Sequence, residues 1–198
     1  MRAIHLLRRN VVQLPCRYLS LFSVFDSVFK VPALDSVELQ PIKVRLWKAL
    51  SDKDYGGTSE CMTEVVEKDD VQGVMVFKGI VNFSESTAEA TNAVGGFCAV
   101  KGFLQRPVDL RDYMGFSMEV KSISSQVFTF NMTCESLFDD DLYQLEIPVN
   151  EEWTTVHLPF HLFKLTAKGA EREFQRKNDS LRLESIGFLM KIPNGKNG

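Results

Sequence analysis

The feature that most constrains this chain is an alternation of large apolar and polar residues with a period of two. It is clearest at residues 116–120, 128–132 and 143–147. Successive side chains of a β-strand point to opposite faces of a sheet, so the alternation predicts half-buried antiparallel strands. Shorter apolar stretches predict further strands at 61–66, 74–81, 97–101, 153–160 and 186–190.

About eight short strands separated by polar turns predict an all-β chain folded as a β-sandwich or jelly roll. The dipeptides Gly56-Gly57 and Gly95-Gly96 favour turns between strands. The chain has 198 residues, of which 44% are hydrophobic, and this is enough for one domain with a substantial core. After residue 30, the helical candidates are 168–178 and 38–50, and we expect short helices there; in 38–50, Leu39, Ile42, Leu46 and Leu50 recur at helical spacing.

The N-terminal 30 residues differ in charge from the rest of the chain. They contain five basic residues and one acidic residue, and Leu7, Val11 and Leu14 recur at helical spacing. This composition is typical of a mitochondrial presequence. We therefore expect a presequence or disordered leader at 1–30, a linker or N-terminal element at 31–50, a β-sandwich domain at 51–192 and a tail at 193–198.

The remainder of the chain is acidic, with 18 basic and 25 acidic residues after residue 30. An acidic body repels phosphate backbones, so we expect no nucleic-acid partner. Charged residues interrupt every apolar run before it reaches the roughly 20 residues of a membrane-spanning helix.

The sequence contains none of the common motifs for catalysis or cofactor binding. His157 and His161 have the spacing of zinc ligands on a helix, but Pro159 lies between them in a predicted strand, which favours ordinary surface residues. No nucleophile elbow, phosphate-binding loop or dinucleotide fingerprint occurs. We therefore predict no catalytic residue, no metal site, no cofactor and no small-molecule substrate.

The densest polar cluster lies at residues 51–60. Asp52 and Asp54 could reach one cation or act as an acid/base pair. A tight turn before the first core strand, in which Asp and Ser bond nearby backbone amides, explains the same residues more simply. An interaction surface remains open, because tyrosine is common at binding patches. The candidate interaction residues are Asp52, Tyr55, Gly56, Gly57, Thr58 and Ser59.

The four cysteines are far apart in the sequence, and none forms a Cys-x-x-Cys pair. With Cys16 in the leader, an odd number remains in the body: Cys61, Cys98 and Cys134. This arrangement suits free buried thiols better than a disulfide framework.

A series of short motifs resembles the complex I intermediate-associated protein family, which are mitochondrial assembly factors for respiratory NADH dehydrogenase. The matching motifs occur in the same order over about residues 47–190. They are Ser51-Asp52 with Gly56-Gly57-Thr58-Ser59, Phe77-Lys78-Gly79, Gly95-Gly96-Phe97, Asp109-Leu110-Arg111-Asp112-Tyr113, Trp153 with Pro159-Phe160 and Phe163, and Ile186-Gly187-Phe188.

The resemblance implies a galactose-binding-like jelly roll and a non-catalytic assembly factor or chaperone that binds intermediates of complex I. Its partners would be protein subunits of an assembly intermediate and other assembly factors. Its location would be the mitochondrial matrix, where a peripheral contact with the inner membrane is compatible with the role.

The sequence departs from the family pattern in two places. A Gly-Asp-Gly-Arg-like turn of the family is replaced by Ser122-Ile123-Ser124-Ser125-Gln126. The family pattern also continues past the Ile186-Gly187-Phe188 strand into another strand, so we expect a sandwich without its last strand. Such a sandwich would expose an unpaired edge, which invites strand donation by a partner.

Two other readings remain open. A carbohydrate-binding module of a secreted protein would use the same fold, with an exposed aromatic platform and glycans on Asn82, Asn131 or Asn178. However, most of the 15 Phe residues alternate with polar residues, as expected for a core. An enzyme would use Asp52, Asp54 or Glu60, with or without a metal ion.

Overall fold

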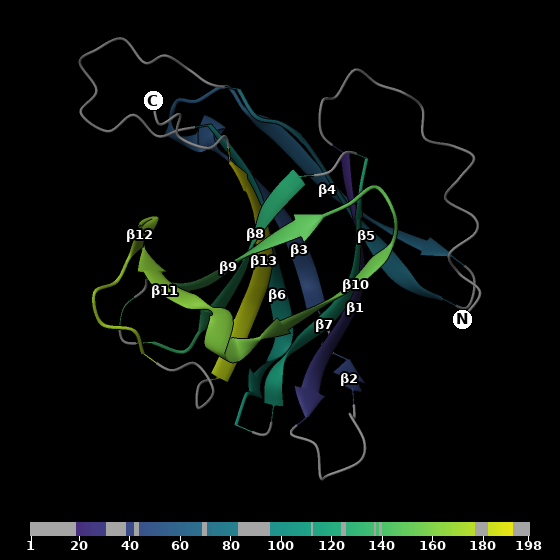
Figure 1. Cartoon of the computed structure of the whole chain (residues 1–198). Helices are drawn as coiled ribbons and strands as arrows, with labels where there is room; N and C mark the ends of the chain where they lie inside the picture. Colours follow the sequence, from purple (N-terminus) through teal and green to yellow (C-terminus); the bar gives the residue numbers. More distant parts are fainter. Residues whose placement is uncertain are drawn as a thin grey trace.

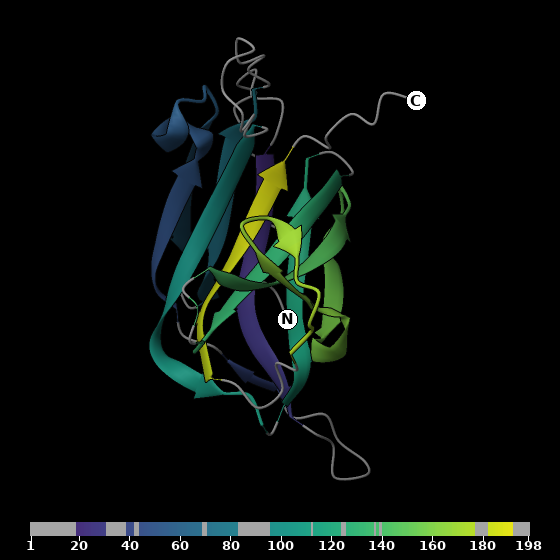
Figure 2. The same cartoon turned by 90° about the vertical axis from the view of Figure 1, so that its left-hand side faces the viewer.

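The structure, a computed structural model, describes residues 19–30, 39–41, 44–68, 71–82, 96–111, 113–123, 126–136, 138, 140–176 and 182–191. These residues form two antiparallel sheets and two short 3-10 helices. The long strands of both sheets run along the long axis of the molecule (Figure 2). The predicted all-β sandwich is therefore confirmed. The predicted tail lies outside the described residues.

One sheet, called sheet A, has the strand order β10-β7-β1-β5-β4, with β2 paired to β1 (Figure 1). Its strands are β1 (Leu19–Lys30), β2 (Leu39–Pro41), β4 (Glu60–Lys68), β5 (Val71–Ile80), β7 (Tyr113–Ser122) and β10 (Thr154–Pro159).

The other sheet, called sheet B, has the strand order β12-β11-β9-β8-β13-β6-β3. Its strands are β3 (Val44–Ser51), β6 (Phe97–Asp109), β8 (Gln126–Cys134), β9 (Asp141–Val149), β11 (Lys164–Ala167), β12 (Ala170–Glu171) and β13 (Arg182–Lys191). The 3-10 helices are η1 (Asp52–Tyr55) and η2 (Phe160–Leu162).

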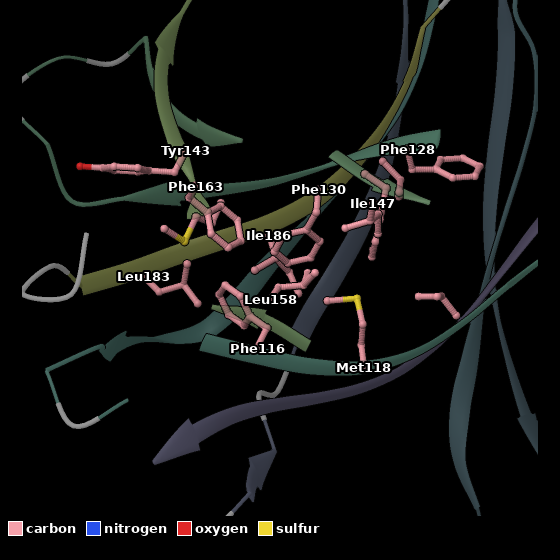
Figure 3. Packing of buried hydrophobic residues seen from close by; sticks show 14 of the residues in the cluster. Phe116, Met118, Phe128, Phe130, Tyr143, Ile147, Leu158, Phe163, Leu183 and Ile186 are labelled. Atoms are coloured by element: carbon pink, nitrogen blue, oxygen red, sulfur yellow. The ribbon is translucent and has the colours of Figure 1, made fainter. Parts of the chain in front are cut away.

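The core lies between the inward faces of the two sheets (Figure 3). Phe116 on β7 of sheet A packs against Phe130 on β8 of sheet B, with ring centroids 5.2 Å apart. Phe130 also packs against Phe188 on β13 at 5.2 Å, nearly edge to face. The alternation in the sequence therefore places large aromatic side chains from both sheets in one interior, where they are shielded from water.

The predicted strands agree with β4 to β10 and β13, whereas both predicted helices are wrong. Residues 44–51 form strand β3, which pairs along its length with β6. Residues 168–176 contain a turn and the two-residue strand β12, which pairs with the preceding strand β11. Apolar spacing of three to four residues does not show which partner a segment will find, and here the open edge of β6 accepts β3 as a strand.

The expected domain boundaries also differ from the structure. Strand β1 lies inside sheet A, where Leu19 to Ser23 pair with β5 and Ser20 to Lys30 pair with β7. The sandwich includes β3 as well, so it takes in residues assigned above to the leader and the linker. Residues 1–18, with the apolar stripe of the predicted presequence, lie outside the described residues.

The last described strand, β13, lies between β8 and β6 in sheet B and not at an edge. Among the described strands, the edges of the two sheets are β10, β4, β12 and β3.

We predict that Phe130→Ala lowers the free energy of unfolding by about 3–5 kcal/mol, because it removes a fully buried ring that joins the two sheets. Val127 lies on the same strand and is 57% exposed, and Val127→Ala should cost less than about 1 kcal/mol. Urea unfolding of both variants measures the difference. Equal losses would contradict this description of the core.

We predict that deleting residues 2–17 leaves the sandwich intact, whereas deleting residues 2–30 destabilises it. The longer deletion removes β1 and leaves the facing edges of β5 and β7 without their partner. Thermal unfolding and size-exclusion chromatography of the two chains give the measurement. If both deletions unfold at the same temperature, β1 has no structural role.

Candidate functional site

The polar segment at residues 51–60 is a tight turn that joins sheet B to sheet A. The side chain of Ser51 accepts a hydrogen bond from the backbone N–H of Lys53 and caps η1. Gly56 then takes a left-handed conformation with φ of 87°, which glycine adopts without a Cβ clash. The chain reverses there and enters β4 at Glu60.

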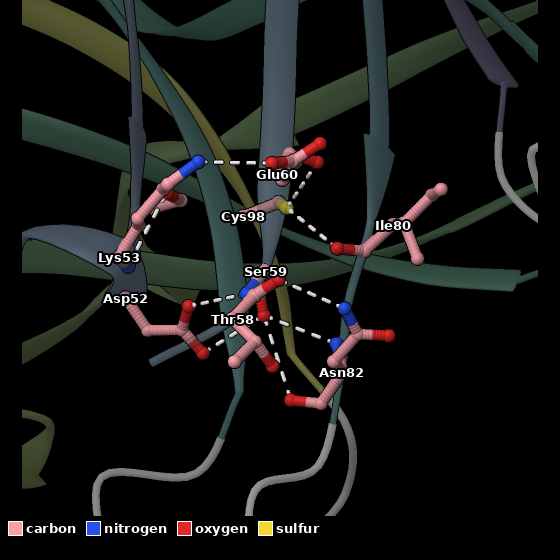
Figure 4. Close-up of polar contacts among 9 residues, drawn as sticks. Asp52, Lys53, Thr58, Ser59, Glu60, Ile80, Asn82 and Cys98 are labelled. Atoms are coloured by element: carbon pink, nitrogen blue, oxygen red, sulfur yellow. Dashed lines mark hydrogen bonds and ion pairs between the residues drawn. The ribbon is translucent and has the colours of Figure 1, made fainter. Parts of the chain in front are cut away.

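The Asp52 carboxylate lies at the centre of this turn with 2% of the residue exposed. Its Oδ1 accepts a hydrogen bond from the backbone N–H of Ser59 at 2.8 Å. Its Oδ2 accepts one from the Ser59 hydroxyl at 2.8 Å (Figure 4). The same oxygen accepts one from the backbone N–H of Phe97 at 3.3 Å. One buried carboxylate thus joins η1, the start of β4 and the start of β6.

Neighbouring residues extend this network. The Ser59 hydroxyl accepts a hydrogen bond from the N–H of Asn82, and the Asn82 side chain donates to the backbone oxygen of Thr58 at 2.8 Å. A Cβ at Gly57 would lie 2.3 Å from the Asp52 carboxyl carbon. The glycine is therefore required by the close approach of the backbone to the carboxylate.

These contacts give the predicted site residues different roles. Asp52, Gly57 and Ser59 build the turn, and Thr58 contributes its backbone oxygen. Both Asp52 oxygens already accept hydrogen bonds from protein groups, which favours the structural reading of this carboxylate over a cation ligand or a base. Tyr55 differs from them, because 76% of it is exposed.

The remaining acidic groups of the turn do not converge on a common point. Asp54 is exposed, and Glu60 forms an exposed ion pair with Lys53 at 2.9 Å. The hydrogen bond between them lowers the pKa of Glu60 and raises that of Lys53. Within the described ranges, no three His, Cys, Asp or Glu residues are grouped so that they could hold a metal ion.

Tyr55 stands beside a second set of residues that the sequence reading missed. Its ring lies 6.4 Å from that of Phe97, the first residue of β6. Cys98, Val100 and Leu104 of β6 belong to the core, so the alternate residues point to the outer face of sheet B. These outward residues are Phe97, Ala99, Lys101 and Phe103.

The neighbouring strand β3 continues this surface. In the register of the pair, Leu46 lies opposite Phe103, Lys48 opposite Lys101, and Leu50 opposite Ala99. We call the combined surface the outer β3–β6 face; it consists of Leu46, Lys48, Leu50, Tyr55, Phe97, Ala99, Lys101 and Phe103.

The outer β3–β6 face combines apolar area with positive charge. Leu46 is 55% exposed, and the Lys101 ammonium lies 5.4 Å from the centre of the Phe103 ring. Aromatic and aliphatic groups among a few charges are the composition of many protein-contact surfaces. The predicted strand at 97–101 could have revealed half of this face, but the predicted helix at 38–50 hid the other half.

The histidines that were considered as ligands lie elsewhere. His157 is on β10 and His161 is in η2, and both are exposed. Each helix in the described part is a single short 3-10 turn, and neither has the length or apolar character needed to cross a bilayer.

Comparison with solved structures identifies the class of fold. The architecture is that of a galactose-binding-like β-sandwich. A family 11 carbohydrate-binding module from Clostridium thermocellum, solved with a β-1,3-1,4-mixed-linked tetrasaccharide, matches with a TM-score of 0.54 at 15% identity, over 87% of this chain and 89% of that one. The family 11 module of the cellulase Lic26A-Cel5E from the same organism matches with a TM-score of 0.53 at 17% identity, over 87% and 88% of the two chains.

The family model named complex I intermediate-associated protein 30 (CIA30) matches residues 37–198. The chain therefore belongs to the CIA30 family, as the order of its motifs predicted. No curated protein gives a significant match in a sequence search.

We predict that Asp52→Ala lowers the free energy of unfolding by about 2–4 kcal/mol, because it leaves buried donors of Ser59 and Phe97 without their acceptor. The matched control, Asp54→Ala, removes an exposed carboxylate of the same turn and should change stability by less than about 0.5 kcal/mol. Chemical denaturation distinguishes them. An Asp52→Ala variant as stable as the control would show that the network is not structural.

Proposed function

We propose that this chain is a mitochondrial assembly factor that binds a protein intermediate of complex I through the outer β3–β6 face, without catalysing a reaction. The observation that carries the proposal is the CIA30 family match over residues 37–198. Two of the acidic residues considered for an enzyme site also support a non-catalytic role. The Asp52 carboxylate holds the turn through its hydrogen bonds, and Glu60 forms an ion pair with Lys53.

The outer β3–β6 face suits a protein partner better than a small molecule. Its apolar residues are spread along two strands, and Lys48 and Lys101 add positive charge between them. A partner with apolar side chains and a few carboxylates would match that pattern. Tyr55, as the most exposed aromatic of the face, is the natural anchor for such a contact.

We predict that the double variant Leu46→Ala/Tyr55→Ala reduces recovery of the complex I intermediate by about tenfold or more, because it removes two exposed apolar contacts from the outer β3–β6 face. The measurement is affinity purification from mitochondria followed by native electrophoresis and quantitative mass spectrometry. Phe174→Ala serves as the matched control, since Phe174 is 86% exposed and lies outside this face. Equal recovery of both variants, with the fold intact, would reject the face but not the assembly role.

The assembly role has its own test. In respiring cells, wild-type chain should migrate with a high-mass subcomplex that contains complex I subunits. A chain found only as free protein would contradict the role, whichever surface it uses.

We also propose that residues 1–18 direct import into the matrix, since most basic residues of the expected leader precede Leu19 and β1 begins there. A reporter fused to residues 1–18 should enter mitochondria, and Arg8→Gln/Arg9→Gln should reduce its import. Microscopy and protease protection give the measurement. A reporter that stays in the cytosol would contradict the proposal.

A carbohydrate-binding role remains the second candidate because the fold is shared with modules of that name. Tyr55, Phe97 and Phe103 are the aromatic residues that the outer β3–β6 face could offer to a sugar, although the rings of Tyr55 and Phe97 are tilted by 44° and form no flat platform. Binding of β-glucan oligosaccharides by the purified chain, lost in Tyr55→Ala, would favour this candidate.

A further inference from the structure

Two cysteines from different sheets meet at the edge of the core near the turn at residues 51–60. Cys61 lies on β4 of sheet A, and Cys98 lies on β6 of sheet B. The Cys61 thiol donates to the backbone oxygen of Leu50 on β3 at 3.0 Å. The Cys98 thiol donates to the backbone oxygen of Glu60 on β4 at 3.3 Å (Figure 4). Each sulfur therefore reaches the backbone of the opposite sheet.

The position of Gly79 on β5 shows how close the two cysteines are. A Cβ placed on Gly79 would lie 2.9 Å from the Cys98 sulfur and 3.1 Å from the Cys61 Cβ. Both atoms are thus near one point, and a side chain at residue 79 would press against both cysteines. Close approach of two side chains from different strands is the geometric condition for a disulfide.

Cys61 differs from Cys134, the third described cysteine, in the pKa of its thiol and in its exposure to solvent. Interaction with the Cys98 side chain lowers the pKa of Cys61 to about 7, and interaction with the Cys61 side chain together with burial raises the pKa of Cys98. Cys61 is also partly exposed on an edge strand, so an oxidant can reach it. Cys134 is buried, and burial raises its pKa to about 12.

We infer that Cys61 and Cys98 form a redox-active dithiol, which a peroxide converts into a disulfide between β4 and β6. Nothing in the assembly role requires such a site, so the inference stands apart from the proposed function. It assigns to Cys61 the attacking position and to Cys98 the resolving position, since the partly exposed thiol with the lower pKa reacts first.

The reaction balances with hydrogen peroxide as the oxidant. The Cys61 sulfur attacks one peroxide oxygen, the O–O bond breaks, and the products are a sulfenic acid on Cys61 and water. The Cys98 sulfur then attacks the Cys61 sulfur, the S–O bond breaks, and hydroxide leaves with the Cys98 proton as a second water. Peroxide is reduced to water, and two thiols are oxidised to one disulfide.

The test treats the folded full-length chain, in a Cys16→Ser background, with hydrogen peroxide under native conditions. After remaining thiols are blocked, peptide mapping without reduction should show the Cys61 peptide joined to the Cys98 peptide, and a dithiol reductant should separate them. Cys134→Ser should form the same link, whereas Cys61→Ser and Cys98→Ser should form no intramolecular disulfide.

Two further measurements address the geometry and the reactivity of the pair. Gly79→Ala places a methyl group against both the Cys98 sulfur and the Cys61 Cβ and should slow disulfide formation severalfold, because the two side chains must then move to accommodate it. In the untreated chain at pH 7, iodoacetamide should label Cys61 more than about 100-fold faster than Cys134.

A link from Cys61 to Cys134, over-oxidation of Cys61 to sulfinic acid without a partner, or no disulfide at peroxide concentrations that oxidise the unfolded chain would each overturn the inference.

Discussion

The structure depends on the burial of the inward faces of two sheets against each other. Phe116 of sheet A and Phe130 of sheet B are both almost fully buried and in contact, and Phe163 and Phe188 pack around them. Aromatic rings bury much apolar area, and their release from water is the main favourable term in folding. Because the inner faces of the described strands form this core, the outer faces, the edges and the turns are what the sandwich offers to a protein partner.

The turn at residues 51–60 connects the two sheets at the edge of the sandwich. The backbone groups that this connection buries need hydrogen-bond partners. The Asp52 carboxylate satisfies backbone and side-chain donors of Ser59 and Phe97 that would otherwise be buried without partners. A motif that resembles a catalytic or metal-binding cluster in the sequence is therefore explained by the fold. By fixing the end of η1 beside β6, it also positions Tyr55 next to Phe97 on the outer β3–β6 face.

At the same edge, strand β6 has aromatic and basic residues on its outer face and a buried cysteine on its inner face. The outer side of β6 presents Phe97 and Lys101 to the surface, while its inner side places Cys98 against Cys61 of the other sheet. A strand with apolar residues on both faces can serve the core and a contact surface at once. The proposed contact surface and the Cys61–Cys98 pair therefore lie on opposite faces of β6.

The sequence by itself determined the fold class and most of the strands of the sandwich, because period-two patterning and local turn residues depend only on neighbours along the chain. The family followed from a different feature, the order of short motifs along residues 47–190. The sequence could also place Asp52 and Ser59 in a turn. Only the tertiary structure decided that β3 is a strand, that Leu19–Lys30 enters sheet A, and that Cys61 meets Cys98. Each of these facts is a pairing between segments tens of residues apart, and the free energy that fixes it comes from partners that local spacing does not reveal.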